Sequence, residues 1–124
     1  MQWPHNGDKL NDQQKDQWRK THNFIMSRDG YMCQRCGNPA TQLAHSIGQD
    51  KSKKHNRNIS MIQREWKNLF GIVIDKHEAC DIIHHHLNLH ASCAKCNDYF
   101  NITHKPEAVR ALLRVIHDYK NAEE

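Results

Sequence analysis

The sequence has few apolar residues and lacks any long apolar run. Hydrophobic residues make up 37% of the 124 residues, and aromatic residues only 7%. No segment approaches the roughly 20 consecutive apolar residues of a membrane-spanning helix, so we expect no membrane partner. The opening segment, MQWPHNGDKL, also lacks the apolar stretch of a secretory signal, which favours a cytoplasmic location. A chain this polar buries only a modest core, and a bound metal ion would help it to fold.

Internal repeats and low-complexity tracts are absent as well, and the length fits a single domain. Apolar residues recur at helical spacing in three segments, which predicts helices at about residues 11–27, 60–70 and 106–120. Weak alternation of apolar and polar residues predicts a short strand at 41–47, and we expect a second strand at 80–90. This mixture of elements predicts a small α+β fold.

Four of the five cysteines form two CxxC pairs, Cys33 with Cys36 and Cys93 with Cys96. In a reducing compartment such pairs bind metal more often than they form disulfides. Four thiolates complete the tetrahedral coordination of Zn²⁺, so we expect a structural zinc site without an open position for chemistry. A redox site would require a CxxC that opens a helix after a strand, and the sequence does not show that pattern. The remaining Cys80 is expected to be a small buried residue.

The chain is mildly basic, with a formal net charge of +4 and eleven histidines. The segment 48–59, GQDKSKKHNRNI, is predicted to be a loop. Its cationic residues are candidates for contacts with nucleic-acid phosphates, and they are Lys51, Lys53, Lys54 and Arg57. A solvated basic loop without a nucleic-acid partner explains the same residues.

The cysteine pairs and the residues beside them resemble the HNH endonucleases, a family with a ββα-metal motif that four cysteines often hold. The segment NLHASCAKCN is similar to the family pattern NLxxLCxxCH, and RDGYMCQRCG is similar to RDxxxCxxCG. The segment LAHSI follows where the family has its histidine strand. The resemblance covers about residues 28–101, with 48–79 as an insertion, and implies that residues 1–124 form one zinc-stapled ββα-metal domain with flanking helices.

The resemblance implies a metal-dependent endonuclease that hydrolyses DNA phosphodiester bonds with a histidine-activated water and one divalent ion. Asn97 stands where the family has its final histidine. Its amide oxygen can bind a hard ion such as Mg²⁺ or Mn²⁺, so the substitution is compatible with activity. By the same resemblance, Asn88 would hold the histidine strand against its neighbour and orient the base.

The histidine strand departs from the family pattern, which has a metal ligand followed by a base histidine. Here only His45 is present, between Ala44 and Ser46. In one register His45 is the metal ligand and Ser46, a poor base, takes the base position. In the other, which we favour, His45 is the base and Ala44 cannot be a ligand. Because neighbouring side chains of a strand point to opposite faces, His85 is expected to point away from the histidines beside it and to supply the extra ligand or base.

A second function class fits the same residues. A catalytically inactive zinc-knuckle module that binds nucleic acid or a protein would have the cysteines and the basic loop, and the lone His45 favours it. The endonuclease predicts two classes of metal site, one tight and one exchangeable, whereas the binding module predicts only the first. As an endonuclease, the chain is expected to act on double-stranded DNA, with a homodimer as one arrangement and a prokaryote or phage as its setting.

Overall fold

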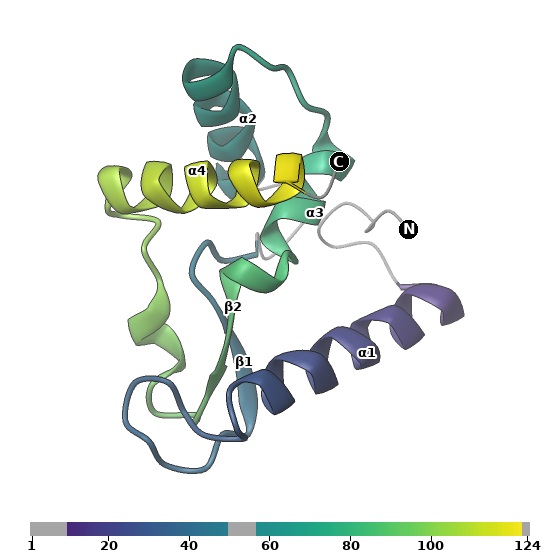
Figure 1. The fold of residues 1–124 in the computed structure, drawn as a ribbon, viewed down its shortest axis with the longest axis vertical. Helices are drawn as coiled ribbons and strands as arrows, with labels where there is room; N and C mark the ends of the chain where they lie inside the picture. The colour runs from purple at the N-terminus through teal and green to yellow at the C-terminus, as the bar shows by residue number, and fades with distance from the viewer. Residues whose placement is uncertain (1–9, 50–56, 123–124) are drawn as a thin grey trace.

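The computed structural model describes residues 10–49 and 57–122, which form a small α+β fold (Figure 1). The elements in chain order are α1 (Asp12–Arg28), β1 (Gln42–His45), α2 (Arg57–Phe70), α3 (Lys76–Ile83), the 3₁₀ helix η1 (His86–Asn88), β2 (Leu89–Ser92), the 3₁₀ helix η2 (Asn97–Phe100) and α4 (Pro106–Ala122). Helices α2, α3 and α4 lie together in the upper part of Figure 1, and the strand pair and α1 lie below them.

Helix α1 forms where the sequence predicts it, and both of its ends are fixed by hydrogen bonds. At the start, Asn11 Oδ1 accepts from the backbone N–H of Gln14, and Gln14 Oε1 accepts from the backbone N–H of Asn11, which is a capping box. At the other end, the Arg28 guanidinium donates to the carbonyl oxygens of His86 at 2.9 Å and Leu89 at 2.7 Å. These bonds attach the end of α1 to the segment that leads into β2.

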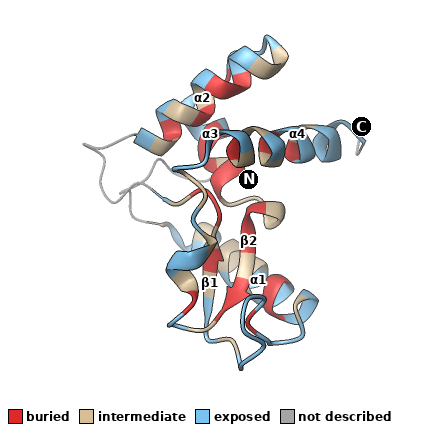
Figure 2. Ribbon diagram, turned by 90° about the vertical axis from the view of Figure 1, so that its left-hand side faces the viewer, coloured by how far each residue is buried: buried red, intermediate tan, exposed pale blue. Residues whose placement is uncertain are grey.

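The main apolar core lies between α2, α3 and α4, where the buried residues of Figure 2 line the facing sides of the helices. The core residues are Ile47, Ile59, Ile62, Trp66, Ile74, Ala79, Cys80, Ile82, Ile83, Val109, Leu113 and Ile116. Cys80 is fully buried here, as predicted. At the edge of this core Arg110 Nε donates to Glu65 Oε2 at 2.9 Å and joins α4 to α2. The predicted insertion, residues 48–79, therefore contributes much of the core.

The two strands are antiparallel, with Ala44 opposite His90 and His45 opposite Leu89. Neighbouring side chains of a strand point to opposite faces. Ala44 and His90 therefore share one face, named here the Ala44 face, and His45 and Leu89 share the other, the His45 face. The ring of Trp18 from α1 lies against His45, so α1 covers the His45 face. In Figure 1 the light-green turn of η2 lies on the opposite side of the strand pair from α1.

The strand predicted at 80–90 is wrong over its first part, because helix α3 runs as far as Ile83 and only Leu89–Ser92 forms β2. The side chain of Asp75 accepts from the backbone N–H of Glu78 at 2.8 Å and caps the start of α3. The apolar run that follows then packs into the helical core. A helix places these residues on one buried side, and the strand prediction missed this because the run is short.

Two further boundaries differ from prediction. Helix α2 begins at Arg57, three residues before the predicted start at 60, and shortens the predicted loop. After β2, the described chain forms only the four-residue η2 and no α-helix until α4. Asn101 Oδ1 accepts from the backbone N–H of Thr103 at 2.8 Å, which forms a local turn directly after η2. In the ββα-metal motif that the resemblance implies, an α-helix follows the second strand, and here a 3₁₀ turn takes that place.

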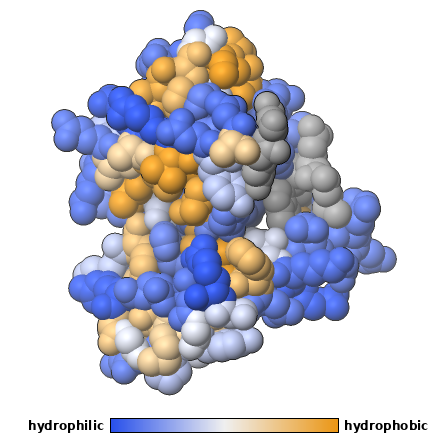
Figure 3. All heavy atoms as spheres, viewed as in Figure 1, coloured by the Kyte–Doolittle hydropathy of each residue, from blue (hydrophilic) through white to orange (hydrophobic). Residues whose placement is uncertain are grey.

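In the part of the chain that the structure describes, no helix has the length and apolar character that crossing a membrane requires. Helix α1 buries only Ile25 and Met26 among its residues. In the view of Figure 3, hydrophobic residues gather over α2 and α4, whereas the region over α1 is mainly hydrophilic.

Candidate metal centre and candidate active site

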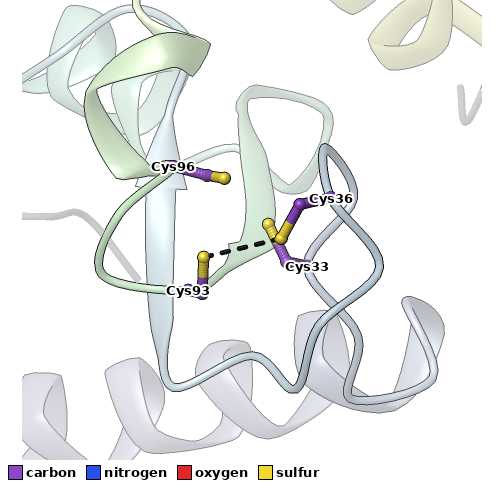
Figure 4. A group of neighbouring side chains, drawn as sticks. All are labelled: Cys33, Cys36, Cys93 and Cys96. Carbon is purple, nitrogen blue, oxygen red and sulfur yellow. Dashed lines mark hydrogen bonds between the residues drawn. The ribbon is translucent and has the colours of Figure 1, made fainter.

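The four cysteines of the two CxxC pairs come together, as the sequence predicts (Figure 4). Cys33 and Cys36 lie in the turn between α1 and β1, and Cys93 and Cys96 lie between β2 and η2. The antiparallel pairing of β1 with β2 brings these two segments to the same end of the sheet. The cluster thus joins the chain before the first strand to the chain after the second.

The first cysteine turn is shaped by backbone hydrogen bonds. The N–H of Cys33 donates to the carbonyl of Asn38 at 2.7 Å, and the N–H of Gly37 donates to the carbonyl of Cys33 at 2.9 Å. Gly37 has φ +79°, a left-handed conformation that a residue with a Cβ adopts only under strain. The glycine after Cys36 is therefore required by the turn that presents the two sulfurs.

The sulfur positions fit one tetrahedral metal ion. All four Sγ atoms lie within 4.8 Å of one another, and Sγ of Cys36 and Sγ of Cys93 are 3.7 Å apart. A disulfide requires about 2.05 Å, so these two sulfurs are not bonded to each other. Zn–S bonds of about 2.3 Å in a tetrahedron place sulfurs close to this spacing. The cluster is consistent with a structural Zn²⁺.

The pKa values of the thiols are shifted in opposite directions within the cluster. Burial raises the pKa of Cys33, but backbone N–H groups of Cys93 and of its own turn outweigh that effect and lower it to about 6. The Arg35 guanidinium, 3.6 Å from Cys96 Sγ, lowers the pKa of that thiol. Burial and the neighbouring sulfurs outweigh Arg35 and raise it to about 11. Four thiolates at this distance repel one another, and a divalent metal removes that repulsion.

Asn88 is fully buried between the end of β1 and the end of α3. Its Oδ1 accepts from the backbone N–H of Ile47 at 2.8 Å, and its Nδ2 donates to the carbonyl oxygens of Ile47 at 3.0 Å and Ile83 at 2.7 Å. Its own carbonyl accepts from the N–H of Ser46 at 3.0 Å. Asn88 therefore fixes the backbone directly after His45, and its amide reaches backbone atoms rather than the His45 ring.

His45 is partly buried on its own face of the strand pair, among aromatic rings. The rings of His45 and Trp18 are nearly parallel with centroids 6.2 Å apart, and the ring of His84 meets His45 edge-on at 5.5 Å. Its Nε2 lies 3.4 Å from the side-chain nitrogen of Gln49. Burial, with a smaller effect from the nearby His90, lowers the pKa of His45 to about 4. The imidazole is therefore neutral at pH 7.

His85 does not lie beside His45, and the histidine that does is His84. Because residues 84–86 are not part of a strand, the alternation expected there does not apply. The ring of His85 stacks on His86 with centroids 4.3 Å apart and contacts Tyr119 of α4. Burial, with a smaller effect from His45, lowers the pKa of His84 to about 3.

An open pocket of about 510 Å³ lies between α1 and the segment after α3, and the three consecutive histidines 84–86 line it. Its lining residues are Gln17, Lys20, Thr21, Phe24, Asp81, His84, His85 and His86. The ring of Phe24 meets His86 edge-on, with centroids 6.0 Å apart. His85 therefore faces a pocket that His84 also lines, and His84 links that pocket to His45.

Asn97 opens η2 and lies against β1. Its Nδ2 donates to Gln42 Oε1 at 2.9 Å and to the carbonyl oxygen of Leu43 at 3.3 Å. Both bonds use the amide nitrogen, so the amide oxygen is the atom that can serve as a metal ligand. The arrangement places Asn97 next to the histidine strand, but at the end nearer to the cysteines.

Sequence reasoning missed His90, which lies on β2 opposite Ala44. Its Nε2 is 2.7 Å from the hydroxyl of Ser46, the residue directly after His45. Burial and the cation of Arg28 lower the pKa of His90, and Asp29 opposes that shift. The available clue was its position in the sequence, two residues after Asn88 and in the strand that leads to Cys93. When the two strands pair, His90 lies opposite Ala44 and shares a face with it.

The predicted phosphate-binding residues are only partly described. Lys51, Lys53 and Lys54 lie outside the described residues, whereas Arg57 is the exposed first residue of α2. Two further cations, Arg35 and Lys95, lie in the cysteine turns and are exposed, and Arg35 lies 3.8 Å above the ring of Tyr99. Basic side chains therefore occur at the cysteine cluster as well as near the predicted loop.

Comparison with known proteins gives no family assignment for this chain. No protein-family model matches it, and no curated protein or solved structure matches it. A functional proposal therefore rests on the cysteine cluster and on the residues around His45.

Proposed function

We propose that the chain is a metal-dependent endonuclease that hydrolyses phosphodiester bonds in DNA, with His45 as the base that activates the attacking water. The observation that carries the proposal is the pair of hydrogen bonds by which buried Asn88 holds the backbone of Ile47. A general base acts only when it is held at a fixed position beside the reacting group. These two hydrogen bonds, named here the Asn88 clamp, meet that need. Neither of them uses a ring nitrogen of His45.

The cysteine cluster supports the proposal by fixing the ends of the strand pair. Bound Zn²⁺ would be coordinated tetrahedrally by Cys33, Cys36, Cys93 and Cys96 and would have no open position for water or phosphate. Its role is therefore to hold the turn before β1 against the turn before η2. This keeps His45, the last residue of β1, and Asn97, the first residue of η2, at a constant separation.

The neutral state of His45 supports its role as base. With a pKa of about 4 the ring carries no proton at pH 7 on the nitrogen that must accept one. An anionic phosphodiester beside the ring raises its pKa, because negative charge stabilises the imidazolium. A divalent ion near Asn97 would stabilise the charge on the phosphate and on the leaving oxygen. Exposed cations such as Arg57 would contact flanking phosphates and add affinity without sequence preference.

One observation favours a second function, nucleic-acid or protein binding without cleavage. When His45 is the base, the position of the metal ligand falls on Ala44, which is fully buried and has no ligand atom. A site with a base and no metal would not stabilise the leaving oxygen. The chain would then be a zinc-stabilised binding module on the same scaffold.

Incubation of supercoiled plasmid with the zinc-loaded protein separates the two functions. The endonuclease nicks or linearises the plasmid with Mg²⁺ or Mn²⁺, and EDTA stops the reaction while the cysteine-bound zinc remains. The binding module retards the same DNA in a gel and leaves it intact with every ion. Retained zinc is measured in the same samples, so that loss of fold is not mistaken for loss of the exchangeable ion.

A further inference from the structure

Asn97 and His45 lie on different sides of β1, and this limits how a catalytic ion can be held. Asn97 donates to the side chain of Gln42 at 2.9 Å, and Gln42 belongs to the Ala44 face by strand alternation. The His45 ring instead lies against Trp18 of α1. Figure 1 shows the same separation, with η2 and α1 on opposite sides of the strand pair. An ion bound by Asn97 therefore needs its next protein ligand from the Ala44 face.

His90 is the histidine on that face. It lies directly opposite Ala44, and Cβ atoms of such cross-strand pairs are about 4.5–5.5 Å apart, so its side chain reaches the space beside residue 44. Its ring stacks on Phe100 with centroids 5.1 Å apart and planes at 16°. Phe100 ends the four-residue helix η2 that begins at Asn97. The His90 ring thus lies between the strand pair and the element that carries Asn97.

The Ser46 hydroxyl, 2.7 Å from Nε2 of His90, orients the ring. When Nε2–H donates to this hydroxyl, the lone pair of the neutral ring is on Nδ1. Histidines that bind metals commonly have this arrangement, in which one nitrogen donates to a protein oxygen and the other binds the ion. Ser46 is itself held by Asn88, whose carbonyl accepts from its N–H at 3.0 Å. The clamp that fixes the backbone after His45 therefore also fixes the partner of His90.

We propose that His90 supplies the metal ligand that Ala44 lacks, and that His90 and Asn97 together bind the divalent ion of the catalytic site. The inference rests on the proposed endonuclease function and specifies its metal. An imidazole nitrogen beside an amide oxygen favours Mn²⁺, Co²⁺ or Ni²⁺, because Mg²⁺ prefers a shell of oxygens and water. His45, on the other face, is then not needed as a ligand of this ion.

Mn²⁺ binding by the zinc-loaded protein tests the inference without using activity. The wild type is expected to bind one exchangeable Mn²⁺, measured by the loss of the free-ion signal in electron paramagnetic resonance. Changes outside the first coordination shell already weaken metal binding by about 10–100-fold. His90→Ala and Asn97→Ala should therefore weaken it by about tenfold or more, whereas the exposed His104→Ala should not. Unchanged binding in folded His90→Ala would overturn the proposal.

A spectroscopic measurement identifies the ligand directly, using His90→Gln as a second variant that keeps a polar side chain at this position. Electron spin echo modulation of bound Mn²⁺ should show the coupling of a directly bound imidazole nitrogen. The coupling should persist in His45→Ala and disappear in His90→Gln. The reverse pattern would make His45 the ligand and would overturn the proposal.

The outcomes also separate this inference from the function on which it rests. If the wild type cleaves plasmid with Mn²⁺ and His90→Ala binds Mn²⁺ as well as the wild type, the endonuclease stands and His90 is not its ligand. If the wild type neither binds an exchangeable ion nor cleaves DNA, both proposals are wrong.

Discussion

The side-chain amide of Asn88 forms two hydrogen bonds with the backbone of Ile47, accepting from its N–H at 2.8 Å and donating to its carbonyl at 3.0 Å. A third bond, to the carbonyl of Ile83 at 2.7 Å, extends the contact to the end of α3. An amide side chain offers the donors and the acceptor that this arrangement needs. One buried residue thereby joins the strand that carries His45 to the helical core.

Replacement of Asn88 by alanine is expected to destabilise the fold strongly. It removes three hydrogen bonds and leaves the backbone groups of Ile47 and Ile83 without these partners. A buried polar group without a partner costs about 1–3 kcal/mol, so we expect a loss of about 3 kcal/mol in the free energy of unfolding. Urea denaturation measures this loss, with the exposed Asn68→Ala on α2 as the matched control. A loss below 0.5 kcal/mol, about the size expected at an ordinary surface position, would contradict the clamp.

Loss of one ligand of the cysteine cluster is expected to prevent folding of the strand region. Binding of a structural metal is part of the folding free energy, so Cys33→Ser or Cys96→Ser should lose the metal and the ordered strand pair together. Cys80→Ala is the matched control, because this cysteine is buried in the helical core and lies outside the cluster. Zinc content and far-ultraviolet circular dichroism follow the two losses. A metal-free Cys33→Ser protein that folds like the wild type would show that the cluster is not structural.

Much of the fold can be predicted from the sequence, because several elements have strong local signals. The capping residue Asn11 and the helical spacing of Val109, Leu113 and Ile116 mark α1 and α4. The two CxxC pairs indicate that their segments meet. Helix α3 was missed, because its apolar residues form a short run that periodicity cannot assign. Its Asp75 cap, with Glu78 three residues later, is the local signal that identifies it.

The pH dependence of cleavage is expected to follow the depressed pKa of His45. Burial disfavours the charged imidazolium, so the ring stays neutral until the pH falls to about 4. Because only the neutral ring accepts a proton, kcat/KM should be independent of this group from about pH 6 to 8 and should fall as the pH approaches 4. Steady-state cleavage across this range, with zinc content checked at each pH, measures the profile. An acid limb near the ordinary histidine pKa of about 6.5 would show that the base is not the buried His45.

Replacement of Arg28 by lysine is expected to lower the stability of the fold. It donates to the carbonyls of His86 and Leu89 and pairs with Asp29, whose Oδ2 in turn accepts from the N–H of Ala91. A lysine keeps the charge but cannot form this set of bonds. Arg28→Lys should therefore lower the free energy of unfolding by about 1–3 kcal/mol, the range for hydrogen bonds to charged groups. Arg19→Lys, on the exposed side of α1, is the control that should change little, and equal effects would contradict this role.

The candidate site is less predictable than the fold, because it depends on which residues the strand pairing brings together. The position of Asn88 relative to the cysteines is visible in the sequence, and so is the lone His45. His85 was favoured through strand alternation, but the chain there forms the end of α3 and η1, which turns His84 toward His45 instead. The contact of His90 with Ser46 joins residues 44 positions apart and depends on the register of β1 with β2.

The most direct test of the proposed function compares plasmid cleavage by the wild type and by His45→Ala, both zinc-loaded and supplied with Mn²⁺. A general base contributes about 10²–10⁴-fold to the rate, so His45→Ala should lose at least about a hundredfold while keeping its fold and its cysteine-bound zinc. The exposed His77→Ala, on α3, should cleave like the wild type. Cleavage by His45→Ala at the wild-type rate would contradict the assignment of His45 as the base.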